Sequence, residues 1–406
     1  MNTDVVKLGE ITSITKLAGF EFTKYFNYNQ TGEIIALRAL NLRNGKLDLT
    51  DIHRIDKSIS DKLPRSKLYK GDILFTYTGN GYGDCALVDE DDKYHLAPNI
   101  CKITSNQEKV DYTFLFYTIR SKSFYGQVSG FIGGSGQPTI PMERIRKLKI
   151  FLPKMQVQQK IANILSRYDE AIENNNKRIK LLEQMAQNLY KEWFVRFRFP
   201  GYENCEFENG IPVGWKVCRL KDFGKIITGK TPPTEQEEYY GEDVMFVKTP
   251  DMHGNIFVQS TSEYLSKLGC EYQKSQYIPE NSIMVSCIGT GGITSINAYP
   301  ANTNQQINSI ILDDKNNLPW LYFTVSSMKE TIKMFGNTGT TMTNLSKGKF
   351  EKLKVLKPYD ELIQKFSIKV NPIFERIKLL NKQITNLAKQ RDLLLPRLMS
   401  GELEVR

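Results

Sequence analysis

One segment of the sequence matches a phosphate-binding motif. Residues 224–231, Gly-Lys-Ile-Ile-Thr-Gly-Lys-Thr, fit the pattern G-x-x-x-x-G-K-[ST]. In that motif, backbone N–H groups and the lysine bind nucleotide phosphates at the start of a helix. Here Pro232 and Pro233 follow at once, and a residue that precedes proline disfavours helical backbone. We therefore expect a turn or an extended segment, and a P-loop nucleotide-binding enzyme stays only as an alternative.

Other catalytic and metal-binding patterns are not found in the sequence. His53, His95 and His253 are far apart, and the six cysteines contain no Cys-x-x-Cys pair. The sequence therefore predicts no acid–base pair, no metal site and no disulfide framework. We expect no catalytic residue, no metal and no cofactor on this chain. Unpaired cysteines and the lack of a long apolar run favour a cytoplasmic protein.

A set of polar loop residues points instead to nucleic acid. The 406 residues carry a formal charge of +10, which favours a polyanionic partner. Arg, Lys, Asn and Gln read base edges, while Gly, Ser and Thr let the backbone approach phosphates. Such residues recur in turn-rich segments of both halves of the chain. The predicted DNA-binding residues are Arg38, Asn41, Arg43, Lys46, Tyr77, Thr78, Asn80, Tyr82, Ser135 and Gln137 in the first half, and Lys248, Thr249, Asp251, His253, Thr290, Gln305, Thr340 and Thr341 in the second.

The two halves are related by an internal duplication. Residues 137–165 align without a gap with residues 342–370, at a constant offset of 205. Each half is strand-rich and is followed by a long helix, which predicts one α+β module plus one helix, written twice. Strands are predicted at 34–42, 72–77, 100–104, 145–152, 243–248, 282–288 and 307–312, with shorter helices at about 112–123 and 319–334.

Each long helix has the apolar spacing of a coiled coil. Apolar residues fall at alternating steps of three and four, which predicts that the two helices pair with each other. Asn175 and Arg391 are polar residues within this seam and would fix its register. Pro200-Gly201 is expected to end the first helix, Pro372 to mark the start of the second, and Pro396 to end or kink it. The predicted seam comprises Leu165, Ile172, Ile179, Leu182, Leu189, Ile377, Leu380, Ile384, Leu387 and Leu394.

The duplication also predicts how the helices would position the modules. If a pseudo-two-fold axis relates the copies, the second helix runs back antiparallel to the first. A seam of this length spans roughly 42 Å, enough to place two modules about one DNA turn apart (~34–36 Å). Because the modules differ in sequence, the DNA site would be bipartite and asymmetric. The alternative is a coiled-coil adaptor whose β-rich modules bind another ligand.

The whole chain resembles the specificity subunit of type I restriction–modification systems. The resemblance is carried by the module–helix duplication and by residues 150–153, 158–161, 192–197, 211–215, 228–232 and 394–403. It implies a target recognition domain at 1–154, a central coiled-coil helix at 155–199, a second recognition domain at 200–358 and a C-terminal helix at 359–406. It also implies a non-catalytic subunit that recognises a split site in double-stranded DNA.

The resemblance further implies partner subunits that supply the chemistry. Two methylation subunits would bind S-adenosylmethionine and methylate adenine, and two restriction subunits would cleave DNA with ATP and Mg²⁺.

Overall fold

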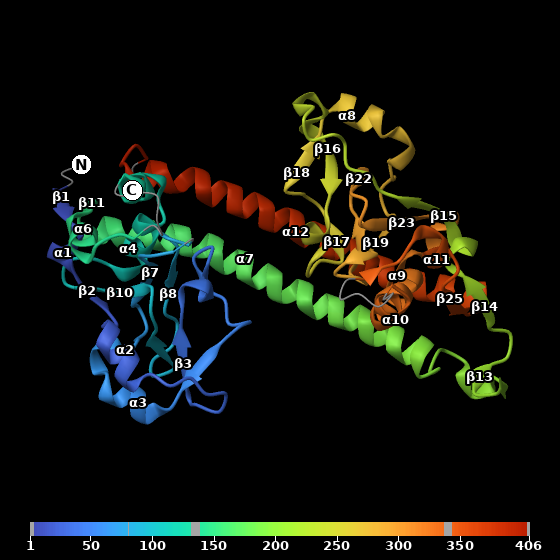
Figure 1. Ribbon diagram of the computed structural model, residues 1–406, viewed down its shortest axis with the longest axis horizontal. Helices are drawn as coiled ribbons and strands as arrows, with labels where there is room; N and C mark the ends of the chain where they lie inside the picture. Colours follow the sequence, from blue (N-terminus) through green and yellow to red (C-terminus); the bar gives the residue numbers. More distant parts are fainter. Residues whose placement is uncertain (1–3, 80, 131–138, 337–342, 404–406) are drawn as a thin grey trace. The chain divides into compact units, whose positions relative to one another are not determined.

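The computed structural model describes residues 4–79, 81–130, 139–336 and 343–403 (Figure 1). The chain divides into two compact units, Met1–Ile172 with Asn386–Arg406, and Glu173–Thr385. The two long helices are α7 (Met155–Tyr190) and α12 (Asp360–Met399). Each of them has one part in the first unit and the other part in the second unit. Each unit therefore contains a strand-rich module and a stretch of both helices.

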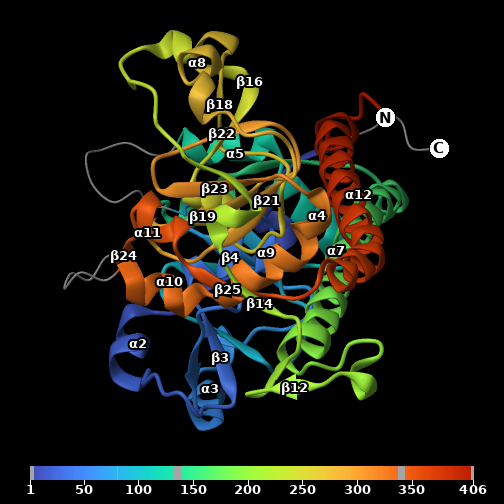
Figure 2. The same cartoon turned by 90° about the vertical axis from the view of Figure 1, so that its right-hand side faces the viewer.

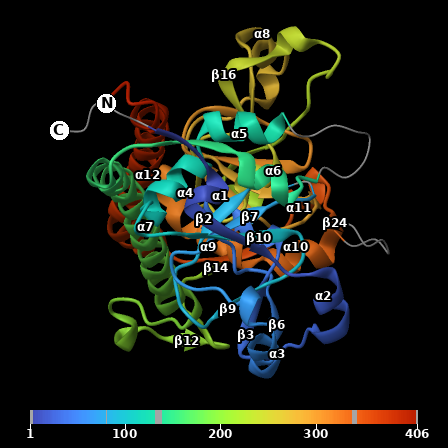
Figure 3. The ribbon, with the colours of Figure 1, turned by 90° about the vertical axis from the view of Figure 1, so that its left-hand side faces the viewer.

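The strands of the first unit form small, mostly antiparallel sheets (Figure 3). One sheet has the order β2-β10-β7-β8, and another has the order β6-β3-β9, in which β3 and β9 are parallel. β1 pairs with β11, and β4 with β5. The strands are β1 (Asp4–Lys7), β2 (Thr12–Lys16), β3 (Ile34–Leu37), β4 (Leu42–Arg43), β5 (Lys46–Leu47), β6 (His53–Ile55), β7 (Ile73–Thr76), β8 (Cys85–Leu87), β9 (Tyr94–Leu96), β10 (Ile100–Ser105) and β11 (Lys149–Leu152).

Short helices complete the first unit. Helix α4 (Tyr112–Ile119) begins at Asp111, whose carboxylate accepts the N–H of Phe114 at 2.8 Å and caps the helix. Phe114 and Leu115 are buried in the core, and burying each such side chain contributes about 1.5–3 kcal/mol. The remaining helices are α1 (Leu8–Ile11), α2 (Gly19–Tyr25), α3 (Lys57–Lys62), α5 (Lys122–Ser129) and α6 (Met142–Lys147).

The start of α7 is tied to this core by one buried glutamine. Gln158 accepts the N–H of Asp111 at 2.9 Å and donates to the carbonyl of Pro153 at 2.8 Å. A buried amide needs such partners, because an unsatisfied one costs about 1–3 kcal/mol. Gln158 therefore joins the first turn of the long helix to the cap of α4.

The second unit repeats the same pairing scheme. Its larger sheet has the order β15-β23-β19-β21-β17, and a second sheet has the order β18-β16-β22, with β16 and β22 parallel. The strands are β12 (Phe207–Glu208), β13 (Ile211–Pro212), β14 (Lys216–Arg219), β15 (Gly224–Thr228), β16 (Tyr240–Val247), β17 (Phe257–Val258), β18 (Glu263–Leu265), β19 (Ile283–Ser286), β20 (Ile288–Gly289), β21 (Thr294–Asn297), β22 (Ala301–Thr303), β23 (Ile307–Leu312), β24 (Thr343–Asn344) and β25 (Lys354–Lys357).

The helices of the second unit pack on these sheets (Figure 2). Trp320 and Leu321 of α9 are buried in the same apolar cluster as Ile283 of β19 and Ile310 of β23. The order β2-β10-β7-β8 thus corresponds to β15-β23-β19-β21, and β6-β3-β9 to β18-β16-β22. The predicted duplication is confirmed. The helices are α8 (Lys267–Tyr272), α9 (Leu318–Ser327), α10 (Lys329–Gly336) and α11 (Lys347–Glu351).

The long helices contact each other within each unit. In the second unit, the ring centroid of Phe366 lies 6.4 Å from that of Tyr190, and Asn175 donates to Gln383 at 3.5 Å, which is an antiparallel arrangement. In the first unit, Arg391 forms an ion pair with Asp169. The predicted seam residues are buried (Leu165, Ile172, Ile179, Ile377 and Leu380) or half-buried (Leu182, Leu189, Ile384, Leu387 and Leu394).

One predicted strand is wrong in its first half. Of the strand predicted at 145–152, residues 145–147 belong to helix α6 (Met142–Lys147), and only Lys149–Leu152 form a strand, β11. Ile145 and Leu148 are both buried. Because they are three residues apart, both lie on one face of a helix. A short helix therefore buries the same two side chains, which the alternation of apolar and polar residues did not predict.

The prolines do not limit the long helices as predicted. Helix α12 begins at Asp360 and continues through both Pro372 and Pro396 to Met399. A proline removes one bond to the carbonyl four residues earlier, and the residues at those places, Ile368 and Asp392, are exposed, so water can solvate the freed carbonyls. Helix α7 gives way to a π-helical turn at Lys191–Val195, before Pro200.

Among the described residues, no helix is both long and apolar enough to span a lipid bilayer.

Candidate nucleic-acid interface

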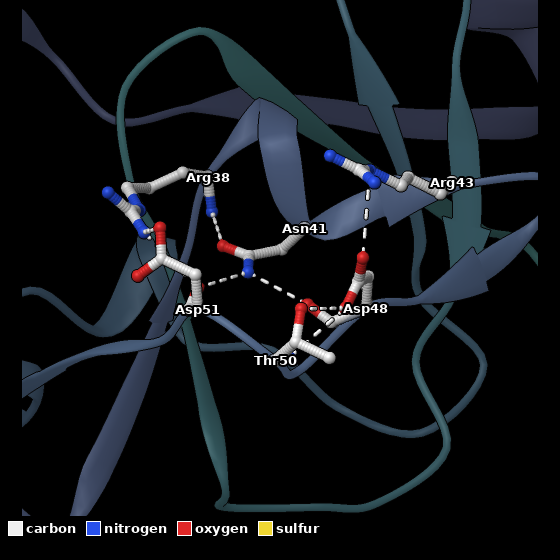
Figure 4. Close-up of polar contacts among 6 residues, drawn as sticks. All are labelled: Arg38, Asn41, Arg43, Asp48, Thr50 and Asp51. Atoms are coloured by element: carbon white, nitrogen blue, oxygen red, sulfur yellow. Dashed lines mark hydrogen bonds and ion pairs between the residues drawn. The ribbon is translucent and has the colours of Figure 1, made fainter. Parts of the chain in front are cut away.

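A buried asparagine shapes the turn that follows β3 (Figure 4). Asn41 accepts the backbone N–H of Arg38 at 3.0 Å and donates to the carbonyls of Asp48 and Asp51, each at 2.8 Å. These bonds use both of its N–H groups and its oxygen. Asn41, which the sequence offered as a base-reading residue, therefore holds the turn together in this structure. A contact with DNA would have to replace these bonds.

The charged side chains of this turn are partly paired. The Arg38 guanidinium lies 3.2 Å from the Asp51 carboxylate, and its side chain is 20% exposed. Asp48 accepts the hydroxyl of Thr50 at 2.6 Å, and this bond is the largest cause that lowers the pKa of the Asp48 carboxyl. Arg43 lies 3.6 Å from the same carboxylate. Asp51 and Asp48 therefore position the two arginine side chains, which both remain partly exposed to solvent.

Two cations stand at the end of the adjoining hairpin β4–β5. Arg43 keeps 68% of its side chain exposed, and Lys46 is exposed as well. The turn between them uses Asn44 (φ 51°) and Gly45 (φ 80°), the left-handed pair that a tight hairpin requires. A bridge between Gly45 and Ala86 places the hairpin against β8. Arg43 and Lys46 therefore flank a tight turn that lies beside β8.

The loop between β7 and β8 carries the next predicted residues. Tyr77 is half-buried with the Lys16 ammonium 5.2 Å from its ring centroid, and burial raises the pKa of its hydroxyl. The hydroxyl of Thr78 is hydrogen-bonded to that of Thr139. Tyr82 stacks on Tyr125 with centroids 6.0 Å apart. The end of this loop lies beside the β4–β5 hairpin, because Gly83 and Asp84 line the same cleft as Asn44 and Gly45.

The second unit builds the same turn from different side chains. Lys248 donates its backbone N–H to the Asp251 carboxylate at 2.9 Å, as Arg38 does to Asn41. Its ammonium pairs with Glu263, as the Arg38 guanidinium does with Asp51. A second oxygen of Asp251 accepts the N–H of Ser262 at 3.0 Å. Asp251, like Asn41, is thus engaged within the turn.

The other predicted residues of the second unit differ in exposure. Thr249 is buried and donates its hydroxyl to Gln306 at 3.0 Å, whereas His253 is exposed. Thr290 is exposed in the loop between β20 and β21. Gln305 is exposed and accepts the hydroxyl of Thr231 at 2.5 Å. His253, Thr290 and Gln305 are therefore the accessible candidates on this module.

The segment that matches a phosphate loop does not have that geometry. Gly224–Thr228 is strand β15, and Lys230 donates its N–H to the carbonyl of Thr303 at 2.9 Å. A β-carbon on Gly229 would lie 2.2 Å from that carbonyl oxygen, so the glycine serves close strand packing. No helix starts at Thr231; the next helical residues are a short turn at Glu237–Tyr239.

Five predicted residues, Asn80, Ser135, Gln137, Thr340 and Thr341, lie outside the described residues. Within the described ranges, no group of three or more His, Cys, Asp or Glu side chains is placed to hold a metal ion.

Comparison with known proteins decides the family. The model of the type I restriction modification DNA specificity domain matches residues 2–184 and 212–390. The chain belongs to this family. It is 32% identical to the type I restriction enzyme HindI specificity subunit of Haemophilus influenzae, over 94% of this chain and 96% of that protein. It is 30% identical to the MjaIX specificity subunit of Methanocaldococcus jannaschii, over 72% of this chain and 69% of that protein.

A solved structure has the same fold. The crystal structure of the type I restriction–modification S subunit of M. genitalium superposes with a TM-score of 0.60 at 14% identity, covering 100% of this chain and 97% of that one. The two matched segments of the specificity-domain family each contain one module and part of the long helix that follows it. The family unit is therefore the repeated unit found in the sequence.

The sequence did not point to Arg120, which the structure places beside the candidate interface. Arg120 donates to the carbonyl of Asn44 at 3.4 Å and lies 3.5 Å from the Asp169 carboxylate of α7. It thereby connects the β4–β5 turn to the long helix. The available signal was a single cation directly after the apolar run of α4, where a positive charge complements the helix dipole.

Proposed function

We propose that this chain is the DNA-reading subunit of a type I restriction–modification complex. Each module binds one short sequence in double-stranded DNA, and the two sequences form a bipartite, asymmetric site. The observation that carries this proposal is the repeated turn: Arg38 and Asn41 in one module and Lys248 and Asp251 in the other share a backbone arrangement. Two modules that share this backbone arrangement but carry different side chains can recognise two different DNA sequences.

The chemistry belongs to partner subunits in this proposal. Two methylation subunits, carrying S-adenosylmethionine, modify adenine, and two restriction subunits, using ATP and Mg²⁺, cleave DNA. The chain itself is a non-catalytic subunit that binds none of these cofactors. Its support is the family membership and the relatives named as specificity subunits of type I restriction enzymes.

Sequencing of methylated bases in the host genome tests this function. We expect one split, asymmetric, adenine-methylated motif to disappear when the gene is deleted and to return when it is restored. The alternative adaptor function predicts an unchanged methylation pattern and, for the chain purified with a methylation subunit, no steep loss of DNA affinity with salt.

Variants of single modules test the division of labour. Arg43→Ala combined with Lys46→Ala is expected to weaken binding to one half of the site, because both side chains are exposed beside the candidate turn. Lys177→Ala, an exposed lysine of α7 paired with Glu173, is the control and should leave both halves unchanged. Equal loss at both halves in the double variant would contradict modular reading.

A further inference from the structure

A shallow cleft opens where three segments of the first module meet. Its volume is about 350 Å³, and it is lined by the Asn44–Gly45 turn, by Asp84 and Cys85 at the start of β8, and by residues of α5 with Arg120 just before it. Exposed Tyr125 and Lys122 stand on its α5 side. The cleft therefore lies between the hairpin that carries Arg43 and Lys46 and the loop that carries Tyr82.

The cleft holds the carboxylate of Asp84, which no described residue pairs with. Asp84 is exposed, and its side chain has no hydrogen-bond or ion-pair partner among the described residues. Partial loss of hydration raises the pKa of its carboxyl, and the charge of Arg43 opposes this. Because Asp84 is exposed, its charge needs no partner within the fold, and the carboxylate is available to a ligand that enters the cleft.

The second module shows what the fold alone requires at this position. In the first module, the carbonyl of Asp84 accepts the backbone N–H of Thr76 at 2.8 Å, and in the second the carbonyl of Ile293 accepts that of Ser286 at 2.9 Å. A glycine with positive φ comes directly before each acceptor: Gly83 (φ 85°) before Asp84 and Gly292 (φ 84°) before Ile293. Ile293 packs against the apolar cluster of its module. The loop therefore accepts an apolar side chain, and the carboxylate of Asp84 is not needed to form it.

The backbone holds Asp84 in a defined place. Its N–H donates to the carbonyl of Gly81 at 3.0 Å, and the N–H of Gly83 donates to that of Thr76 at 2.9 Å. The α-carbon of Gly83 lies so close to the Tyr125 ring that a β-carbon would be 2.8 Å from it. The loop is thus seated on α5, and the carboxylate is presented at a fixed point of the cleft.

The surrounding charges define what this carboxylate can bind. Arg43, Lys46 and Lys122 are exposed around the cleft, and such cations suit the DNA backbone. A carboxylate repels phosphate, but it accepts hydrogen bonds from the exocyclic amino groups that bases present in the major groove. We propose that Asp84 is a specificity-determining residue that accepts a hydrogen bond from cytosine N4 or adenine N6 in the half-site read by the first module. This inference rests on the proposed function.

Selection of DNA by the assembled complex tests the role of Asp84. The chain with its methylation subunits would be incubated with randomised duplexes, and the bound DNA sequenced, for the wild type and for Asp84→Asn, Asp84→Ala and Asp84→Ile. We expect the wild type to prefer one amino-bearing base at a position that the variants read differently, with a loss of discrimination of about 5- to 150-fold. The other half-site should be unchanged, and affinity for random DNA should rise because a negative charge is removed.

Two controls separate this role from folding and from the general function. Asp84→Ile carries the residue found at the equivalent place in the second module, so it should fold even if another variant does not. Asp89→Asn removes an exposed carboxylate beyond the other end of β8 and should leave the motif unchanged. A wild-type motif with unaltered discrimination in all three Asp84 variants would overturn the inference while the proposed function stands. A wild-type complex with no sequence preference would overturn both.

Discussion

Asp169 lies at the centre of a polar network that should stabilise the first unit. Its carboxylate accepts the hydroxyl of Tyr117 at 2.6 Å, lies 3.5 Å from Arg120, and forms an ion pair with Arg391 of α12. Burial, followed by the bond to Asp169, raises the pKa of the Tyr117 hydroxyl, which therefore stays a donor. Asp169→Asn keeps the size of the side chain and removes the charge. The two arginines are then left facing an uncharged amide.

The expected cost follows from the exposure of these groups. Breaking a fully buried ion pair costs about 3–5 kcal/mol, but the side chains of Asp169, Arg120 and Arg391 are 21%, 18% and 14% exposed. Water therefore screens part of the interaction, and we expect a loss of about 2–3 kcal/mol. For a unit of roughly 150–250 residues, this corresponds to a fall in melting temperature of about 4–12 °C.

Differential scanning calorimetry of the whole chain measures this effect. Asp392→Asn is the matched control, because Asp392 also pairs with Arg391 at 2.8 Å but has a 62% exposed side chain. An exposed pair is worth about 0.2–1 kcal/mol, so the control should lower the melting temperature by only a few degrees at most. Equal shifts for the two variants would refute the reasoning that burial gives the Asp169 network its strength.

Further outcomes follow from the same structure. His95 is fully buried, and desolvation holds its pKa below the usual value. Below about pH 6.5 the folded chain therefore binds fewer protons than the unfolded chain, so the free energy of unfolding should fall as the pH drops. Urea titrations at several pH values should show this dependence for the wild type and lose it for His95→Asn. Gly83→Ala should lower the melting temperature more than Gly254→Ala, since both glycines have positive φ but only Gly83 would clash with a neighbour; equal effects would count against the close packing. Adding seven residues to both α7 and α12 should lengthen the preferred DNA spacer by about three base pairs, because each helix grows by about 10 Å; selection from randomised duplexes would show an unchanged spacer if the helices do not set it.

The duplication and the long helices could be predicted from the sequence because they depend on local, repeated patterns. Steps of three and four place Leu165 and Ile377 on the inner faces of their helices whatever the rest of the chain does, and both are buried. The two prolines that follow Thr231 also argued against a phosphate loop there, because proline disfavours helical backbone in the residue before it. Family resemblance carried by dispersed segments needed no knowledge of tertiary contacts.

The candidate interface could be predicted only in outline. Residue type marked Asn41 and Arg43 alike as DNA-reading candidates, yet Asn41 is buried with its amide bonded to three backbone groups, while Arg43 is exposed. Whether a polar side chain serves the turn or faces solvent depends on where distant carbonyls lie. Arg120 was missed for the same reason, because its partners Asn44 and Asp169 come from other parts of the chain.

What the sequence determined by itself is therefore the periodic part of this protein: two copies of one module, each followed by a helix with an apolar seam. The tertiary structure decided which residues the copies use differently. Asp84 and Ile293 occupy equivalent loop positions, but only the fold shows that Asp84 lies in a cleft without a partner among the described residues, whereas Ile293 is partly buried against an apolar cluster. Periodicity is a local property of the chain, whereas solvation and hydrogen-bond partners are set by neighbours that folding brings from far away in the sequence.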